Sequence, residues 1–115
     1  MKVSINNNFF DVKVVMSKKE RAEGMMRKNF DDTFNGMLFV ENDGNHCYWM
    51  KNCIIPLDII FIKNNIITQI HSNCPACNEK ECEHYCGEGN IVLELAGGSC
   101  DKLKIKVGDN LQMSF

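Results

Sequence analysis

Apolar and polar residues alternate with a period of two along much of the chain, which is the pattern of half-buried β-strands. Near the N-terminus, Phe10, Val12 and Val14 alternate with Asp11 and Lys13. Other short apolar runs have the same character: "GMLFV" (36–40), "HCYWM" (46–50), "IVLEL" (91–95) and a last strand within "GDNLQMSF" (108–115). Together with the hairpin described below, these runs predict about seven or eight short strands.

One helix is expected in the N-terminal half. The residues from Ser17 to Glu20 read S-K-K-E, a capping box in which each side chain satisfies a backbone amide of the first helical turn. The helix would continue through "KKERAEGMM" and weaken near Gly24. The later stretch "AGGSCDKLK" predicts only a short turn or helix.

Turn residues separate the remaining runs. Asn64-Asn65 lies between "LDIIFI" and "IITQI", so the range Leu57–Ile70 is typical of a β-hairpin. Asp43-Gly44 is a turn signal behind the strand that ends at Val40. The connections between the apolar runs are too short for helical crossovers, which favours antiparallel pairing. Residues 1–115 are therefore expected to form a single, compact, mainly β domain, built as an antiparallel sandwich or barrel.

Composition and charge narrow the class of protein. Apolar residues make up 44% and charged residues 24% of the chain, as in an ordinary globular protein. The net charge of −2 argues against a nucleic-acid binder, which usually carries a basic surface. No run is long and apolar enough for a membrane span. The first residues, Met1 to Met16, lack the apolar core of a signal peptide, so we expect a cytoplasmic location, or an exported one if a leader has been removed.

The segment "HCYWMKNCIIPLDIIFI" (46–62) carries the candidate ligand-binding residues Trp49, Lys51, Asn52 and Asp58. A carboxylate at Asp58 inside an apolar strand must be solvated, hydrogen-bonded or paired. The polar side chains beside an aromatic wall predict a binding cleft. The alternative is structural: Trp49 packs in the core, Lys51 is solvated, and Asn52 and Asp58 stabilise turns.

This segment also carries a family resemblance. "ERAEGMMRKNF", "GMLFVENDGNHCYWMKNCIIPLDIIFI", the C-x4-C-x2-Y run at Cys77, Cys82 and Tyr85, and "VLELAGG…IKVGD" occur in this order. From about Val12 to Gly108 the chain closely resembles the domain-of-unknown-function 192 family, also called uncharacterised protein family 0127. The resemblance implies a mostly β, jelly-roll-like domain without an established reaction. In exported relatives it implies that the pair Cys77 and Cys82 can be oxidised.

The stretch "CPACNEKECEHYC" holds four of the seven cysteines, Cys74, Cys77, Cys82 and Cys86. Their spacing, C-x2-C-x4-C-x3-C, suits the four soft ligands of a structural zinc, with His84 as a substitute ligand. The segment has few apolar residues, so a metal would help to order it. The sequence therefore predicts a zinc-stabilised loop.

Other states of the same cysteines stay open. One or two disulfides are possible, since four cysteines allow three pairings. Reduced thiols, or a redox pair at Cys74 and Cys77, are further alternatives. Cys47 and Cys53 are expected as small apolar fillers.

These observations predict a small non-enzymatic binding or accessory domain that recognises an unknown small molecule or protein. No catalytic residue is assigned. The alternatives are a thiol- or metal-dependent hydrolase or oxidoreductase, and a redox-sensing cysteine loop.

Overall fold

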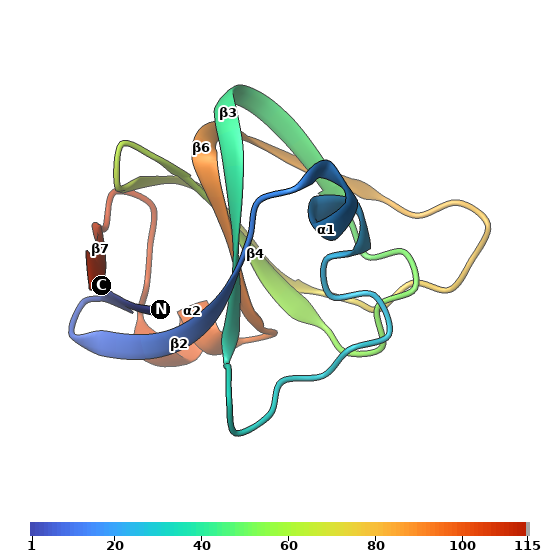
Figure 1. Cartoon of the computed structure of the whole chain (residues 1–115), viewed down its shortest axis with the longest axis horizontal. Helices are drawn as coiled ribbons and strands as arrows, with labels where there is room; N and C mark the ends of the chain where they lie inside the picture. The colour runs from blue at the N-terminus through green and yellow to red at the C-terminus, as the bar shows by residue number, and fades with distance from the viewer. Residues whose placement is uncertain (115) are drawn as a thin grey trace.

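The computed structural model describes residues 1–114 and contains one strongly curled sheet with two short helices (Figure 1). The mainly β, barrel-like class expected from the sequence is confirmed. In chain order the elements are β1 (Lys2–Ile5), β2 (Asn8–Val15), α1 (Lys18–Glu23), β3 (Gly36–Trp49), β4 (Leu57–Lys63), β5 (Ile66–Cys74), β6 (His84–Ala96), α2 (Ser99–Leu103) and β7 (Leu111–Ser114). Neither helix is long enough to cross a bilayer, and residues 1–114 contain no other helix.

The strands follow the order β5-β4-β6-β3-β2-β1-β7. The last pair, β1 and β7, sets Lys2 opposite Ser114. The two outer strands approach each other where β5 begins, because Ile66 forms a bridge with Asn110. The amide of Leu111 donates to the carbonyl of Asn65 at 2.8 Å beside this bridge. The sheet therefore curls towards closure, as in a barrel.

One pair of strands departs from the antiparallel expectation. β2 and β3 run parallel, with Val12 opposite Gly36 and Val15 opposite Phe39. Residues 16–35, which include α1, carry the chain from the end of one strand to the start of the other. The expectation that the connections are too short for a crossover was wrong here, because this one connection is long enough to return the chain.

Local capping chemistry fixes α1 where the sequence predicted it. Ser17 Oγ accepts the amide of Glu20 at 3.1 Å, and Glu20 Oε1 accepts the amide of Ser17 at 3.3 Å. The helix ends at Gly24, whose φ of 45° is open mainly to glycine.

The hairpin between β4 and β5 is also confirmed: Asn64 and Asn65 both have positive φ, as a two-residue turn requires.

The Asp43-Gly44 pair does not make the expected turn. β3 runs without interruption from Gly36 to Trp49, and the pair lies where its register against β6 shifts. Val40 is opposite Ile91, whereas Gly44 is opposite Gly89. The extra residues of β3 are absorbed in an irregularity of the bulge type, which uses the same conformational freedom of glycine as a turn.

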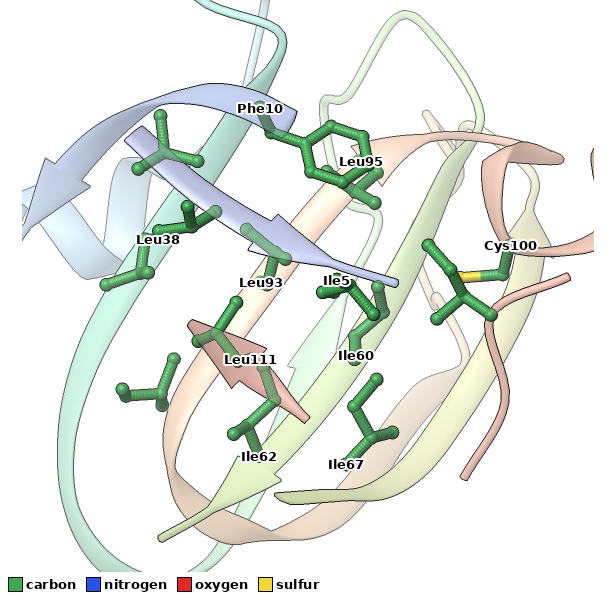
Figure 2. Packing of buried hydrophobic residues seen from close by; sticks show 14 residues of the cluster. Ile5, Phe10, Leu38, Ile60, Ile62, Ile67, Leu93, Leu95, Cys100 and Leu111 are labelled. Atoms are coloured by element: carbon green, nitrogen blue, oxygen red, sulfur yellow. The ribbon is translucent and has the colours of Figure 1, made fainter. Parts of the chain in front are cut away.

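The central strands are buried on both faces. One face packs against β1, β7 and α2; there Ile5, Leu93 and Leu111 come together (Figure 2). The opposite face carries a second cluster that includes Phe39, Phe61 and Val92. The residues that cover this cluster come from the segments that follow α1 and β3 and from the cysteine loop, all of them irregular. A cover of this kind leaves room for a pocket.

Candidate functional site

The pocket lies on the second face of the sheet, under α1, and has a volume of about 180 Å³. Its walls come from α1 and the residues just after it, from β3, and from single residues of β6 and the segment before β4. The lining residues are Arg21, Ala22, Glu23, Gly24, Met25, Met26, Phe39, Glu41, Cys47, Tyr48, Trp49, Cys53 and Glu94.

Glu94 is the most unusual residue of the pocket. It lies near the C-terminal end of β6, between Met37 of β3 and Ile59 of β4, and its relative exposure is only 3%. Within residues 1–114, no group hydrogen-bonds its carboxyl oxygens. Burial raises the pKa of this carboxyl to about 8, because the apolar surroundings disfavour the charged form. At neutral pH, Glu94 is therefore mostly a neutral carboxylic acid.

A second carboxyl group, that of Glu41, is held at the pocket rim. Tyr48 donates its hydroxyl proton to Glu41 Oε2 at 2.7 Å, and Arg21 Nε lies 3.2 Å from Glu41 Oε1. Burial and the neighbouring Glu41 raise the pKa of Tyr48. His46 Nδ1 lies 3.9 Å from the same carboxylate. The groups around Glu41 satisfy one another, in contrast to Glu94.

Aromatic rings line the sheet side. Phe39 and Tyr48 meet edge to face, with ring centroids 5.0 Å apart. Trp49, at the end of β3, packs edge to face on His84 at 5.8 Å and stays 43% exposed. The pocket therefore combines an aromatic wall that is open to solvent with a buried acid.

Cys53 is the thiol of this pocket. An isolated bridge between Cys53 and Met26 joins the segment before β4 to the chain just after α1. Burial raises the pKa of the Cys53 thiol to about 11, and the nearby Glu94 adds to this effect. A thiol with a raised pKa is a poor nucleophile.

Of the four predicted ligand-binding residues, only Trp49 lines this pocket. Lys51 donates through Nζ to the carbonyl of Glu79. The amide of Asn52 donates to the carbonyl of Cys77 at 2.8 Å. Both residues therefore hydrogen-bond the cysteine loop to the chain that follows β3. Asn52 also lines a separate depression with Arg27 and Ile54.

Asp58 lies apart from the other three and is fully buried. Its Oδ1 accepts the amides of Asn73 at 2.7 Å and Gly98 at 2.9 Å, and its Oδ2 accepts that of Cys100 at 2.8 Å. The four residues are not brought into one cleft, and their joint role in binding stays a prediction. Asp58 is held by backbone groups, as the structural alternative expected.

The structure does not support the zinc-stabilised loop. Cys77 and Cys82 form one disulfide, and Cys86 forms another with Cys47 of β3. The remaining predicted ligand, Cys74, is a buried free thiol. Residues 1–114 contain no group of three or more His, Cys, Asp or Glu side chains that could hold a metal. The correction has a physical reason: sulfurs engaged in disulfides cannot serve as thiolate ligands.

The Cys47–Cys86 disulfide was not predicted, and the expectation that Cys47 is a small apolar filler was wrong. The register of β3 against β6 places Cys47 directly opposite Cys86, Tyr48 opposite Tyr85, and Trp49 opposite His84. The mirrored order of thiol and aromatic residues in "CYW" and "HYC" was the available signal.

Glu94 was also missed as a functional residue. The run "IVLEL" predicts its strand correctly, but nothing local says that both faces of that strand are buried. A single acid inside an apolar run was the available signal.

The sequence profile described as DUF192, uncharacterized ACR, matches residues 1–113. The chain belongs to the DUF192 family. No curated protein sequence is significantly similar to this DUF192 chain.

Two solved structures resemble this DUF192 domain closely. A protein of unknown function from Novosphingobium aromaticivorans is 29% identical, with a TM-score of 0.84, over 97% of this chain and 84% of the other. A putative transcription regulator from Sinorhizobium meliloti is 26% identical, with a TM-score of 0.85, over 96% of this chain and 91% of the other. The curled sheet of this domain is therefore shared by both of these proteins.

Proposed function

We propose that this DUF192 domain is a non-enzymatic binding module that takes a small molecule into the pocket above Glu94. The observation that carries the proposal is a buried carboxyl group that lines a cavity and has no hydrogen-bond partner among residues 1–114. Buried polar groups are almost always hydrogen-bonded, and those that are not tend to serve a role. A ligand would supply the missing partner.

The shape and chemistry of the pocket support binding. Ligand sites are usually concave and mainly apolar, with a few polar groups that orient the ligand. Here Met25, Phe39 and Trp49 provide apolar surface, and Glu94 provides the orienting group.

An enzymatic role has weaker support. A pKa near 8 would suit Glu94 as a general acid or base. However, the thiol beside it, Cys53, has a raised pKa rather than a lowered one. Burial likewise raises the pKa of Cys74 to about 11 and raises that of Cys100. None of the three free thiols described has the lowered pKa of an activated nucleophile.

The name of the Sinorhizobium neighbour does not lead us to propose DNA binding for this chain. A formal charge of −2 and a pI of about 5.9 give little attraction to phosphate. The two disulfides support the proposal that the protein functions in an oxidising compartment, because such bonds persist there.

The test uses the chain's one tryptophan, Trp49, which lines the pocket. Soluble fragments with one aromatic ring or a short alkyl chain are screened by saturation-transfer NMR, and hits are titrated against Trp49 fluorescence. The variant Ala22→Phe should block the pocket from the exposed face of α1 without disturbing the core. Ala76→Phe, at another exposed alanine outside the pocket, is the matched control.

We expect hits that change Trp49 fluorescence, lose binding in Ala22→Phe and keep it in Ala76→Phe. If no fragment binds, or if Ala22→Phe binds every fragment as the unmodified protein does, the proposed function is wrong.

A further inference from the structure

We propose that the ligand of the Glu94 pocket is a small organic cation, whose ammonium group pairs with the Glu94 carboxylate while its apolar body lies against Met25, Phe39 and Trp49. This inference rests on the proposed function and names the chemical class of its ligand.

Acidic groups outnumber basic groups in the pocket. Three carboxyl side chains line it, those of Glu23, Glu41 and Glu94, against the single cation of Arg21. Glu23 is exposed, so water screens its charge, whereas Glu94 lies on the floor in apolar surroundings. The electrostatic preference of the pocket is therefore set by its buried end.

The one lining cation is already engaged. Arg21 Nε is paired with Glu41, and Arg21 Nη1 donates to the carbonyls of Met16 and Val40. Lys28 lies close by but does not line the pocket; its Nζ donates to the carbonyl of Gly24 at 3.2 Å. The residues described thus leave Glu94 without a cation of its own.

The walls suit the apolar body of an organic cation. The faces of tryptophan, tyrosine and phenylalanine attract cations, tryptophan most strongly, and this attraction grows when water is excluded. Trp49, Tyr48 and Phe39 all line the pocket. Met25 adds a polarisable thioether that adapts to irregular shapes.

Other classes of ligand fit less well. An anion would meet the carboxylate of Glu41 and prevent Glu94 from ionising, so binding would place like charges together. A neutral ligand could accept a hydrogen bond from protonated Glu94 but would make no use of the aromatic walls as cation sites. An ammonium group supplies both a charge and several N–H donors to the carboxylate.

Binding of the cation involves a proton balance. Neutral Glu94 loses its carboxyl proton to solvent, and the resulting carboxylate pairs with the ammonium, which keeps its own protons. One proton is therefore released for each cation bound below about pH 8, where free Glu94 is protonated. The affinity should rise with pH by up to about tenfold per unit between about pH 6 and pH 7, and level off above about pH 8.

The titratable and charged groups that face Glu94 are few. They come from every element around it: Arg21 and Glu23 of α1, Glu41 and Tyr48 of β3, Cys53 before β4, and Cys74 of β5. The pKa values of Tyr48, Cys53 and Cys74 are all raised, which keeps these groups protonated below about pH 9. His46 reaches the pocket only through Glu41, and His46→Gln serves as a control for this contact.

The experiment is calorimetric titration of the whole chain with three probes of one shape: benzylammonium chloride, benzyl alcohol and sodium benzoate. Each is measured at about pH 6, 7 and 8, in phosphate and in Tris, whose different ionisation heats reveal proton release. We expect benzylammonium to bind most tightly at about pH 8, with one proton released at about pH 6. Glu94→Gln should weaken benzylammonium at least about tenfold at pH 8 and leave benzyl alcohol unchanged. Asp101→Asn removes a negative charge from the exposed surface of α2, outside the pocket, and should change neither.

The outcomes separate the two proposals. If benzyl alcohol binds as tightly as benzylammonium, or if Glu94→Gln keeps the cation's affinity, the cation proposal is wrong while the pocket stands as a binding site. If none of the three probes binds, the cation proposal is also wrong, and the fragment screen decides on the pocket itself. Glu94→Met repeats the test with an apolar side chain of similar length if Glu94→Gln fails to fold.

Discussion

The backbone amide of Cys100 donates a 2.8 Å hydrogen bond to Oδ2 of Asp58, across 42 residues of chain. The other oxygen of Asp58 accepts the amides of Asn73 and Gly98. A single carboxylate in β4 thus fixes the end of β5 and the start of α2. An acid in an apolar strand is satisfied here by backbone rather than by a ligand.

Replacement of Asp58 by asparagine should therefore destabilise the fold. The amide side chain loses the negative charge and turns an NH2 group towards backbone N–H donors. We expect the free energy of unfolding to fall by about 2–4 kcal/mol, measured by urea denaturation. Asp101→Asn, at an exposed acid of α2, should change it by less than about 0.5 kcal/mol. A stable Asp58→Asn protein would contradict this role.

Glu94 should make the protein less stable as the pH rises. Its pKa is about 8 in the folded chain and near 4.5 when unfolded, so the folded state binds the extra proton between these values. The free energy of unfolding should fall by about 1 kcal/mol per pH unit over this range, and level off above about pH 8. Denaturation at a series of pH values should show a smaller slope for Glu94→Gln than for the unmodified protein. Equal slopes in the two proteins would refute the assigned protonation.

The two disulfides should differ in their contribution to stability. Cys47–Cys86 closes a sequence separation of 39 residues and Cys77–Cys82 one of 5. Chain-entropy arguments give about 4 kcal/mol for the first and about 2 kcal/mol for the second. Double alanine variants, compared by urea denaturation without reductant, should follow this order. The reverse order would mean that strain or residual structure outweighs loop closure.

Mass spectrometry should distinguish disulfides from a bound metal. After oxidative refolding, the intact mass should rise on reduction by two hydrogens for each disulfide, and a chelator should leave it unchanged. The free thiols Cys53, Cys74 and Cys100 are buried and should react with iodoacetamide only after unfolding. A metal adduct that the chelator removes would restore the zinc interpretation of the loop.

Helix caps and turns could be predicted from the sequence, whereas the pairing of strands far apart in the chain could not. The capping box at Ser17 and the turn at Asn64-Asn65 depend on neighbouring residues, so the sequence predicted both correctly. The parallel pairing of β2 with β3 depends on where a long connection returns, which no local pattern specifies. The family resemblance reached further, since it implied that Cys77 and Cys82 can be oxidised in exported relatives, and these two cysteines form a disulfide here.

The candidate site was only partly predictable for the same reason. Trp49 was recognised because an aromatic residue among polar ones is visible in sequence. The environment of Glu94 depends on α1 and the chain just after it, which line the same pocket and are brought there by tertiary packing. Cys86 forms its disulfide with Cys47 because the register of β3 and β6 places the two residues opposite each other. The spacing of cysteines along the loop does not determine this pairing.

The pairing of Lys2 with Ser114 brings the two ends of the described chain side by side, across the molecule from α1 (Figure 1). A short linker between these ends would create a circular permutant, and the hairpin at Asn64-Asn65 offers a surface site for the new termini. A tether or dye attached at either end of the described chain would likewise lie away from the pocket. The topology thus allows the domain to be immobilised or circularly permuted for binding studies without altering the Glu94 pocket.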